Sequence, residues 1–85
     1  MYSITFKKSA EKEIYKLPSP FVKRIGLAID KLSQNPRPTS AKKLEGQKEN
    51  LWRIRIDDYR IIYLIEDFIR IIEIRKVGRR KDIYR

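Results

Sequence analysis

The feature that most constrains the fold is a set of three apolar segments in the second half of the chain. These are residues 51–56 (LWRIRI), 59–65 (YRIIYLI) and 68–77 (FIRIIEIRKV). In the first of them apolar and basic side chains alternate, and side chains alternate between the two faces of a β-strand. The segments are rich in isoleucine and tyrosine, which favour strands. They predict three consecutive antiparallel strands joined by tight turns.

The turns between these segments set the expected pairing. A turn at Asp57 and Asp58 places Arg55 directly opposite Arg60. A turn at Glu66 and Asp67 would place Arg60 opposite Glu73 and Tyr63 opposite Arg70. These registers predict one face made of Arg53, Arg55, Arg60, Ile62, Leu64, Ile69, Ile71, Glu73 and Arg75, and a second made of Trp52, Ile54, Ile56, Tyr59, Ile61, Tyr63, Ile65, Phe68, Ile72 and Ile74. The second face is the better core, and a slip by one residue would exchange the two.

The first half of the chain predicts a short strand over residues 2–6 and then two helices. Ser9 is a suitable N-cap for the first helix, which Pro18 should end. The second helix is expected from Ser19, with Pro20 at its first position, to about residue 34. We therefore predict one α+β domain over residues 1–85, in which a small antiparallel sheet of about four strands carries an N-terminal helical hairpin on one face.

Composition excludes several kinds of site. The chain has no cysteine and no histidine, so zinc centres and Ser-His or Cys-His nucleophiles are excluded, and we expect neither a metal nor a cofactor. The missing cysteines, with no signal peptide or membrane span visible, favour the cytoplasm and no membrane partner. The 21 lysines and arginines against 11 acidic residues give a net charge of +10, which indicates a polyanionic partner.

The arginines of residues 51–60 point to RNA as that partner. Arg55 facing Arg60 places like charges across a ladder, which is destabilising unless the charge serves another purpose. A turn at Gly78 would bring the basic tail, with Tyr84, back beside this end of the sheet. Tyrosine and arginine planes stack on unpaired bases, and cations hold phosphates.

Three motifs then show a family resemblance. KLEG (residues 43–46), LWRIRIDDYRIIY (51–63) and KVGRRKDIYR (76–85), placed after two short helices, resemble the RelE branch of the RelE/ParE superfamily of type II toxins. The resemblance covers essentially the whole chain. It implies a ribosome-dependent endoribonuclease that contacts messenger and ribosomal RNA, cuts the messenger in the A site, and is silenced in a hetero-oligomer with a cognate antitoxin.

The resemblance also implies roles for single residues. Its catalytic set falls on Arg53, Arg55, Arg60, Arg80 and Tyr84. Arg53 and Arg60 would hold the scissile phosphate, Arg80 would lie by the leaving 5′-oxygen, and Tyr84 would stack on a base or orient the 2′-hydroxyl. The other cations of this region are expected to contact RNA, namely Arg75, Arg79, Lys81 and Arg85.

One residue departs from the family pattern and leaves the proton acceptor open. Arg55 stands where relatives often have lysine, and arginine effectively stays charged, so it is a poor general base. Glu73, Tyr84 or activation by positioning alone remain as alternatives. Two other functions also remain open, a DNA gyrase poison of the ParE kind and a non-catalytic RNA-binding module, although the basic tail with its tyrosine favours the nuclease.

Overall fold

A computed structural model describes residues 1–79 of the chain, and the expectations for Arg80, Lys81, Tyr84 and Arg85 lie outside this range. Its elements are, in chain order, β1 (Ser3–Phe6), α1 (Lys8–Tyr15), α2 (Ser19–Leu32), β2 (Lys42–Lys43), β3 (Leu51–Ile56), β4 (Tyr59–Glu66) and β5 (Ile71–Arg79). Neither helix of the described range has the length and apolarity needed to cross a membrane.

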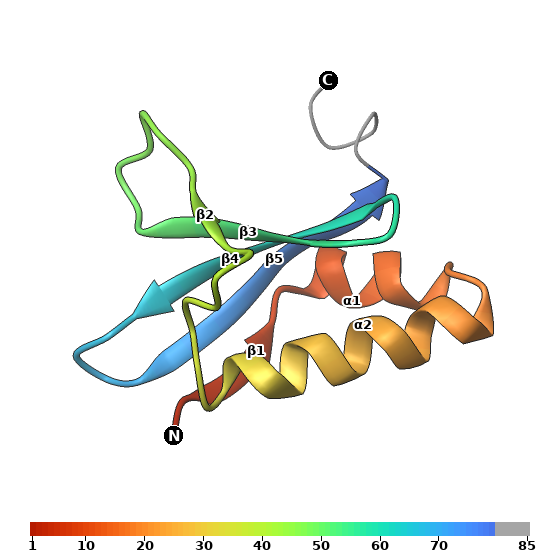
Figure 1. Cartoon of the computed structure of the whole chain (residues 1–85), viewed down its shortest axis with the longest axis horizontal. Coiled ribbons are helices and arrows are strands. Elements are labelled where there is room, and N and C mark those ends of the chain that lie inside the picture. The colour runs from red at the N-terminus through yellow and green to blue at the C-terminus, as the bar shows by residue number, and fades with distance from the viewer. Residues whose placement is uncertain (80–85) are drawn as a thin grey trace.

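The strands form one sheet in the order β1-β5-β4-β3-β2, and both helices lie against one of its faces (Figure 1). This arrangement confirms the predicted α+β class. The sheet is mixed rather than purely antiparallel, because β1 pairs with β5 in the parallel sense. It has five strands because the short β2, within the polar segment before β3, adds to the other edge. We call the face covered by α1 and α2 the helix face, and the face that carries Arg53, Arg55 and Arg60 the arginine face.

The hairpin of β3 and β4 has the predicted register. Arg55 pairs with Arg60, and Ile56 pairs with Tyr59 across a turn at Asp57 and Asp58. Asp57 has φ 54°, a left-handed conformation that aspartate tolerates better than most residues do. The tight turn fixes the pairing, so the alternation of apolar and basic side chains maps directly onto the two faces.

The predicted register of β4 against β5 is wrong. Glu66 pairs with Ile71 and Leu64 with Glu73, so the turn spans residues 67–70 rather than two residues. Phe68 is 99% exposed at this turn and does not belong to the core. Up to Ile74 the pairing is displaced by four residues, an even number, so residues 71–74 of β5 keep their predicted faces. Glu73 lies opposite Leu64, not Arg60.

β5 also contains a bulge at its middle. Tyr63 pairs with Ile74 but its neighbour Ile62 pairs with Lys76, which leaves Arg75 as an extra residue on β5. The strand continues through Gly78 to Arg79, so the chain does not turn at Gly78 as predicted. The bulge returns Val77, only 1% exposed, to the core. The N–H of Val77 donates to Glu13 of α1, which holds the end of β5 against that helix.

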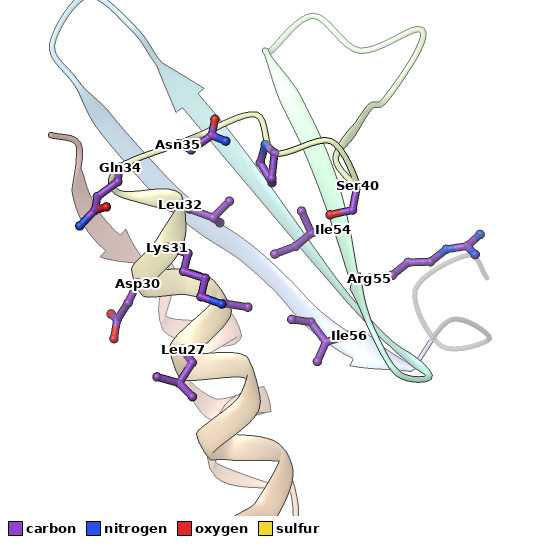
Figure 2. Close-up of a pocket in the computed structure, with 12 residues that line it drawn as sticks. Leu27, Asp30, Lys31, Leu32, Gln34, Asn35, Ser40, Ile54, Arg55 and Ile56 are labelled. Atoms are coloured by element: carbon purple, nitrogen blue, oxygen red, sulfur yellow. The ribbon is translucent and has the colours of Figure 1, made fainter.

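The helices follow the predicted apolar stripe, but both N-caps differ from the prediction, and α2 ends at Leu32 rather than at about residue 34. The N-cap of α1 is Lys7, so Ser9 lies inside the helix and does not cap it. Pro18 caps α2, and a proline occupies the first turn, where its missing N–H is harmless. The C-terminal half of α2 leaves a groove of about 540 Å³ against β3. Figure 2 shows Ile54 and Ile56 directed toward α2 across this groove, whereas Arg55 points away from it.

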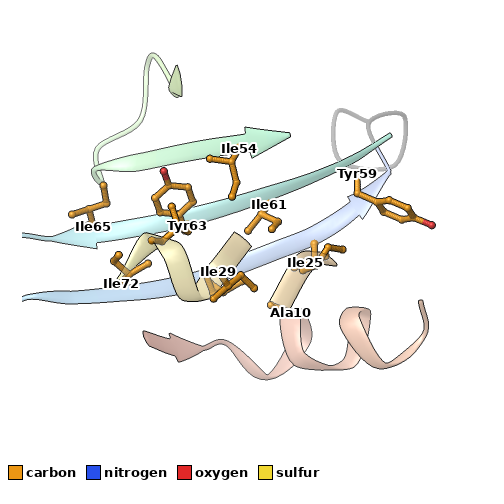
Figure 3. Packing of buried hydrophobic residues seen from close by; sticks show 12 residues of the cluster. Ala10, Ile25, Ile29, Ile54, Tyr59, Ile61, Tyr63, Ile65 and Ile72 are labelled. Atoms are coloured by element: carbon orange, nitrogen blue, oxygen red, sulfur yellow. The ribbon is translucent and has the colours of Figure 1, made fainter. Parts of the chain in front are cut away.

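The core fills the space between the helix face and the two helices (Figure 3). It brings together side chains from both helices and from β3, β4 and β5. Burial of aliphatic side chains is the main stabilising contribution in a domain this small. The buried members are Ala10, Ile25, Ile29, Leu32, Ile54, Tyr59, Ile61, Tyr63, Ile65, Ile72, Ile74 and Val77.

Tyr63 links this core to the loop that follows α2. Its side chain has no exposed surface, and its hydroxyl donates a 2.7 Å hydrogen bond to the carbonyl of Pro36. Burial raises the pKa of Tyr63 to about 12, while the nearby Arg37 acts in the opposite direction. Tyr63→Phe should lower the free energy of unfolding at neutral pH by about 1 kcal/mol, because the carbonyl of Pro36 loses its partner.

The pH dependence of this difference follows from the raised pKa. An unfolded tyrosine loses its proton near pH 10, but folded Tyr63 keeps it to about pH 12. The contribution of protonated Tyr63 to stability is therefore complete below pH 10 and is lost as the pH rises through about 12. The free energy of unfolding falls by roughly 2–3 kcal/mol over this range. The phenylalanine variant has no such loss, so urea titrations between pH 7 and 12 should show the difference shrink and reverse. A constant difference would contradict this, and Tyr15→Phe, 78% exposed, is the matched control.

Candidate nucleic-acid interface

The arginine face is organised in rows that run across the sheet. Arg55 pairs with Arg60, and Arg60 pairs with Gly78 on the next strand. Because directly paired residues share a face, these three form one row, which we call the arginine row. The sheet thus places two arginines directly opposite each other, and Gly78 adds no side chain to their row on β5.

Arg60 lies deep in this surface. Only 3% of it is exposed, and it is the one charged residue among the buried residues of the described range. Arg55 is exposed and Arg53 is half-buried. A cation held at low exposure acts on a neighbouring negative charge more strongly than one in open solvent, because water screens it less. The charge of Arg60 is therefore screened less by water than the charges of Arg53 and Arg55.

The next row contains two lysines that sequence reasoning missed. Arg53 pairs with Lys42 of β2 on one side and with Ile62 on the other, and Ile62 pairs with Lys76. Lys42 lies in a polar segment whose sequence shows no strand pattern. The bulge determines the face of the sheet on which Lys76 lies. Within residues 1–79 neither Arg53, Arg55, Lys42 nor Lys76 forms a salt bridge, so their charges are available to a ligand.

Arg75 lies on the same face but is engaged by two carboxylates. Its Nη1 and Nη2 donate to the two oxygens of Glu49, at 3.1 and 2.7 Å, and its Nε donates to Glu73. These hydrogen bonds hold the pKa of the Glu49 carboxyl below its usual range and raise the pKa of Arg75. Most of the hydrogen-bonding edge of the Arg75 guanidinium is therefore occupied, and its contact with RNA stays a prediction. Glu73 accepts this bond from Arg75 and does not lie opposite Arg60, as the predicted register had placed it.

Arg79 belongs to the other face of the sheet. It pairs with Tyr59, whose ring packs against Phe21 of α2 with centroids 4.9 Å apart. The guanidinium of Arg79 lies 5.9 Å from the centroid of the Tyr59 ring. The described structure thus brings together Arg53, Arg55 and Arg60, and places Arg79 around the same end of the sheet but on the helix face.

The described residues offer nothing that would hold a metal ion. Within residues 1–79 no three of the acidic side chains lie close enough together to form a metal site.

Comparison with known proteins identifies the family. The sequence model described as the ParE toxin of the type II toxin-antitoxin system parDE matches residues 4–84. The chain belongs to the RelE/ParE superfamily of type II toxins. A curated relative, named "Putative toxin RelE1", from Methanocaldococcus jannaschii is 32% identical over 87 residues, which cover 99% of this chain and 96% of that protein.

Solved structures place the chain near the RelE proteins of this superfamily. RelE in the archaeal RelE-RelB complex from Pyrococcus horikoshii OT3 superposes with a TM-score of 0.83 and 31% identity, covering 93% of this chain and 94% of that one. A chain of the intact Escherichia coli RelBE toxin-antitoxin complex superposes with a TM-score of 0.82 and 25% identity, covering 93% of this chain and 96% of that one. The isolated Escherichia coli RelE toxin superposes with a TM-score of 0.81 and 25% identity, covering 99% of this chain and 92% of that one. The protein is thus a RelE-like toxin, as its motifs indicated.

Proposed function

We propose that this RelE-like toxin is a ribosome-dependent, metal-free endoribonuclease that cuts messenger RNA in the A site and so inhibits translation. The observation that carries the proposal is the arginine face. Arg60 is almost fully buried beside Arg55, and Lys42, Arg53 and Lys76 form the adjacent row. Such a surface suits a single strand of RNA, whose phosphates would follow the cations.

The proposed reaction needs no nucleophile from the protein. The 2′-oxygen of one nucleotide attacks the adjacent phosphorus, its proton leaves to an acceptor, and the bond to the 5′-oxygen breaks as that oxygen gains a proton. The products are a 2′,3′-cyclic phosphate and a 5′-hydroxyl. Arg53 and Arg60 would stabilise the charge that builds on the phosphate oxygens, often the largest contribution to catalysis. Arg80 would serve the leaving oxygen, and Tyr84 the 2′-hydroxyl or a base.

The choice of proton acceptor becomes narrower with the observed register. Glu73 is bound to Arg75 and lies opposite Leu64, one row beyond Ile62, so it is poorly placed to act at Arg60. Arg55 keeps its proton. We therefore propose that the 2′-hydroxyl is activated by Tyr84 or by positioning and electrostatics alone.

The experiment that tests this function compares variants on ribosomes carrying a defined messenger. Arg80→Ala and Tyr84→Ala should each lower the cleavage rate by about 100-fold or more, since each removes a group acting on the reacting atoms. Thermal unfolding should stay close to that of the wild type. Arg24→Ala, which removes an exposed arginine of α2, is the control and should cut normally. Normal cleavage by both the Arg80 and the Tyr84 variant would overturn the assignment.

A gyrase poison is the second candidate function. The matching family description names a ParE toxin, which is the observation that favours it. A supercoiling assay with purified gyrase separates the two functions, because only a gyrase poison should trap cleaved DNA. We expect no effect on gyrase.

Binding without catalysis is the third candidate. A non-catalytic RNA-binding module would use the same cations, its affinity would fall steeply with salt, and no product would form. The ribosome assay therefore separates it from the nuclease.

We also propose a cognate antitoxin as the partner in a toxin-antitoxin hetero-oligomer. The related structures from Pyrococcus horikoshii and Escherichia coli are such complexes. Two surfaces suit an antitoxin. The arginine face would attract an acidic segment, and the groove between α2 and β3, beside the 63% exposed Leu27, would accept apolar side chains. Co-expression with the acidic or DNA-binding protein of the neighbouring reading frame should give a stable complex and abolish toxicity.

A further inference from the structure

A second hollow on the arginine face lies next to the two rows of cations. It has a volume of about 440 Å³, within the usual range of small-ligand sites. Leu44, Leu51 and Ile62 give it an apolar lining. Its polar lining residues are Lys7, Glu45, Gln47, Arg75 and Lys76. An apolar surface bordered by three cations, an amide and one carboxylate suits a flat, partly polar ring attached to a phosphate.

The unusual element of this hollow is Arg75. Three of its five N–H groups are directed to Glu49 and Glu73, and two of these bonds form a bidentate pair with Glu49. The in-plane edge is thus largely occupied, and the two carboxylates would repel a phosphate. The face of the guanidinium is not used by these bonds. The side chain is 24% exposed, and it contributes to the lining of the hollow.

Two carboxylates on one arginine fix the orientation of its plane. An arginine in solvent samples many rotamers, and ordering it on a ligand costs conformational entropy. Arg75 is already held, from β5 by Glu73 and from the segment before β3 by Glu49. A rigid guanidinium plane next to an apolar lining is a suitable stacking surface for an unpaired base.

The position of the hollow matches the path expected of the RNA. Ile62 and Lys76 line it, and both lie two residues along their strands from the arginine row. Two residues of a strand span about 6.8 Å. Neighbouring phosphates of an extended single strand are separated by a similar step. A nucleotide next to the one at the arginine row would therefore reach the hollow.

From these observations we infer that the hollow is a subsite for one unpaired base of the RNA, stacked on the guanidinium plane of Arg75, with Lys76 beside its phosphate. Glu49 and Glu73 are positioning residues that hold this plane. The inference rests on the proposed function, since it takes RNA as the ligand. It gives Arg75 a role different from the phosphate contact expected from its charge.

The test is a binding measurement with short single-stranded RNAs, labelled for fluorescence anisotropy, at low salt. Replacing bases one at a time by abasic sugars should identify a position at which the wild-type protein loses about tenfold in affinity, in keeping with the strength of base stacking. Arg75→Lys keeps the charge but removes the plane. It should bind the intact RNA about tenfold more weakly and show no further loss with the abasic RNA.

The matched control is Arg37→Lys. Arg37 is also bound to a carboxylate, that of Asp67 at 2.6 Å, but it packs over Trp52 and does not line the hollow. This variant should respond to the abasic RNA as the wild type does. If Arg75 had only a structural role, Arg75→Lys would lower the affinity for the intact and the abasic RNA by the same factor. That result would overturn the subsite.

The other outcomes separate the subsite from the proposed function. If no base position matters, or if the RNA does not bind, the subsite is wrong, while cleavage on ribosomes is measured independently and can still occur. If ribosomes are not cut but the abasic effect and its loss in Arg75→Lys are found, the subsite stands in an RNA-binding protein that does not cleave.

Discussion

Replacing Arg60 by lysine is expected to lower the rate of messenger cleavage on ribosomes by about 100-fold while the protein stays folded. The substitution keeps one positive charge, but it removes the planar fork of donors that matches a phosphate. Loss of one preorganised donor at a developing oxyanion typically costs 10²- to 10³-fold in rate. Arg60 should be the most sensitive of the described arginines, because it is only 3% exposed.

The control for this experiment is Arg24→Lys. The Arg24 side chain is 61% exposed, binds Asp57 in the turn before β4 and lies over the ring of Phe21 in its own helix. This variant should cut at the wild-type rate. Thermal unfolding of both variants separates a loss of chemistry from a loss of structure. Wild-type cleavage by a folded Arg60→Lys protein would show that the buried arginine does not act at the phosphate.

The second large effect is on stability. Ile61→Ala should lower the free energy of unfolding by about 3–4 kcal/mol, because the side chain lies in the core with no exposed surface and its loss leaves a cavity. A domain of this size has a margin of roughly 4–13 kcal/mol, so the variant should be close to unfolding at physiological temperature. Urea titration followed by circular dichroism measures the difference.

Ile69→Ala makes the same chemical change at the turn before β5, where the residue is 60% exposed. Its effect should stay within about 0.5 kcal/mol. Similar losses for the two isoleucines would contradict the assignment of the helix face as the core.

The two hairpins show why part of the sheet could be predicted. In the first, a turn of two aspartates leaves a single register, and the alternation of arginine and isoleucine then assigns the side chains of β3 to the two faces. In the second, Phe68 and Ile69 extend the apolar pattern of β5 backward, although both are exposed in the turn. Apolar pattern alone cannot distinguish a strand from an apolar turn. Residues 71–74 kept their predicted faces only because the error there was an even number of residues.

The error in the register of β4 against β5 also explains the incorrect prediction that Glu73 lies opposite Arg60. The bulge at Arg75 and the longer turn move Glu73 away from Arg60 and onto Arg75. Neither feature has a sequence signal, since no glycine marks the bulge and no turn dipeptide marks residues 67–70. Arg53, Arg55 and Arg60 were found because one hairpin contains all three. Lys42 and Glu49 were missed because they lie in a polar segment whose path depends on tertiary contacts.

The measurement that tests the central claim most directly is the chemistry of the ends produced on ribosomes carrying a defined messenger. Wild-type protein should leave a 2′,3′-cyclic phosphate on the upstream fragment and a 5′-hydroxyl on the downstream fragment, with the cut in the A-site codon and no requirement for divalent metal in the cleavage step. A 3′-hydroxyl with a 5′-phosphate, or an uncut messenger, would contradict the account.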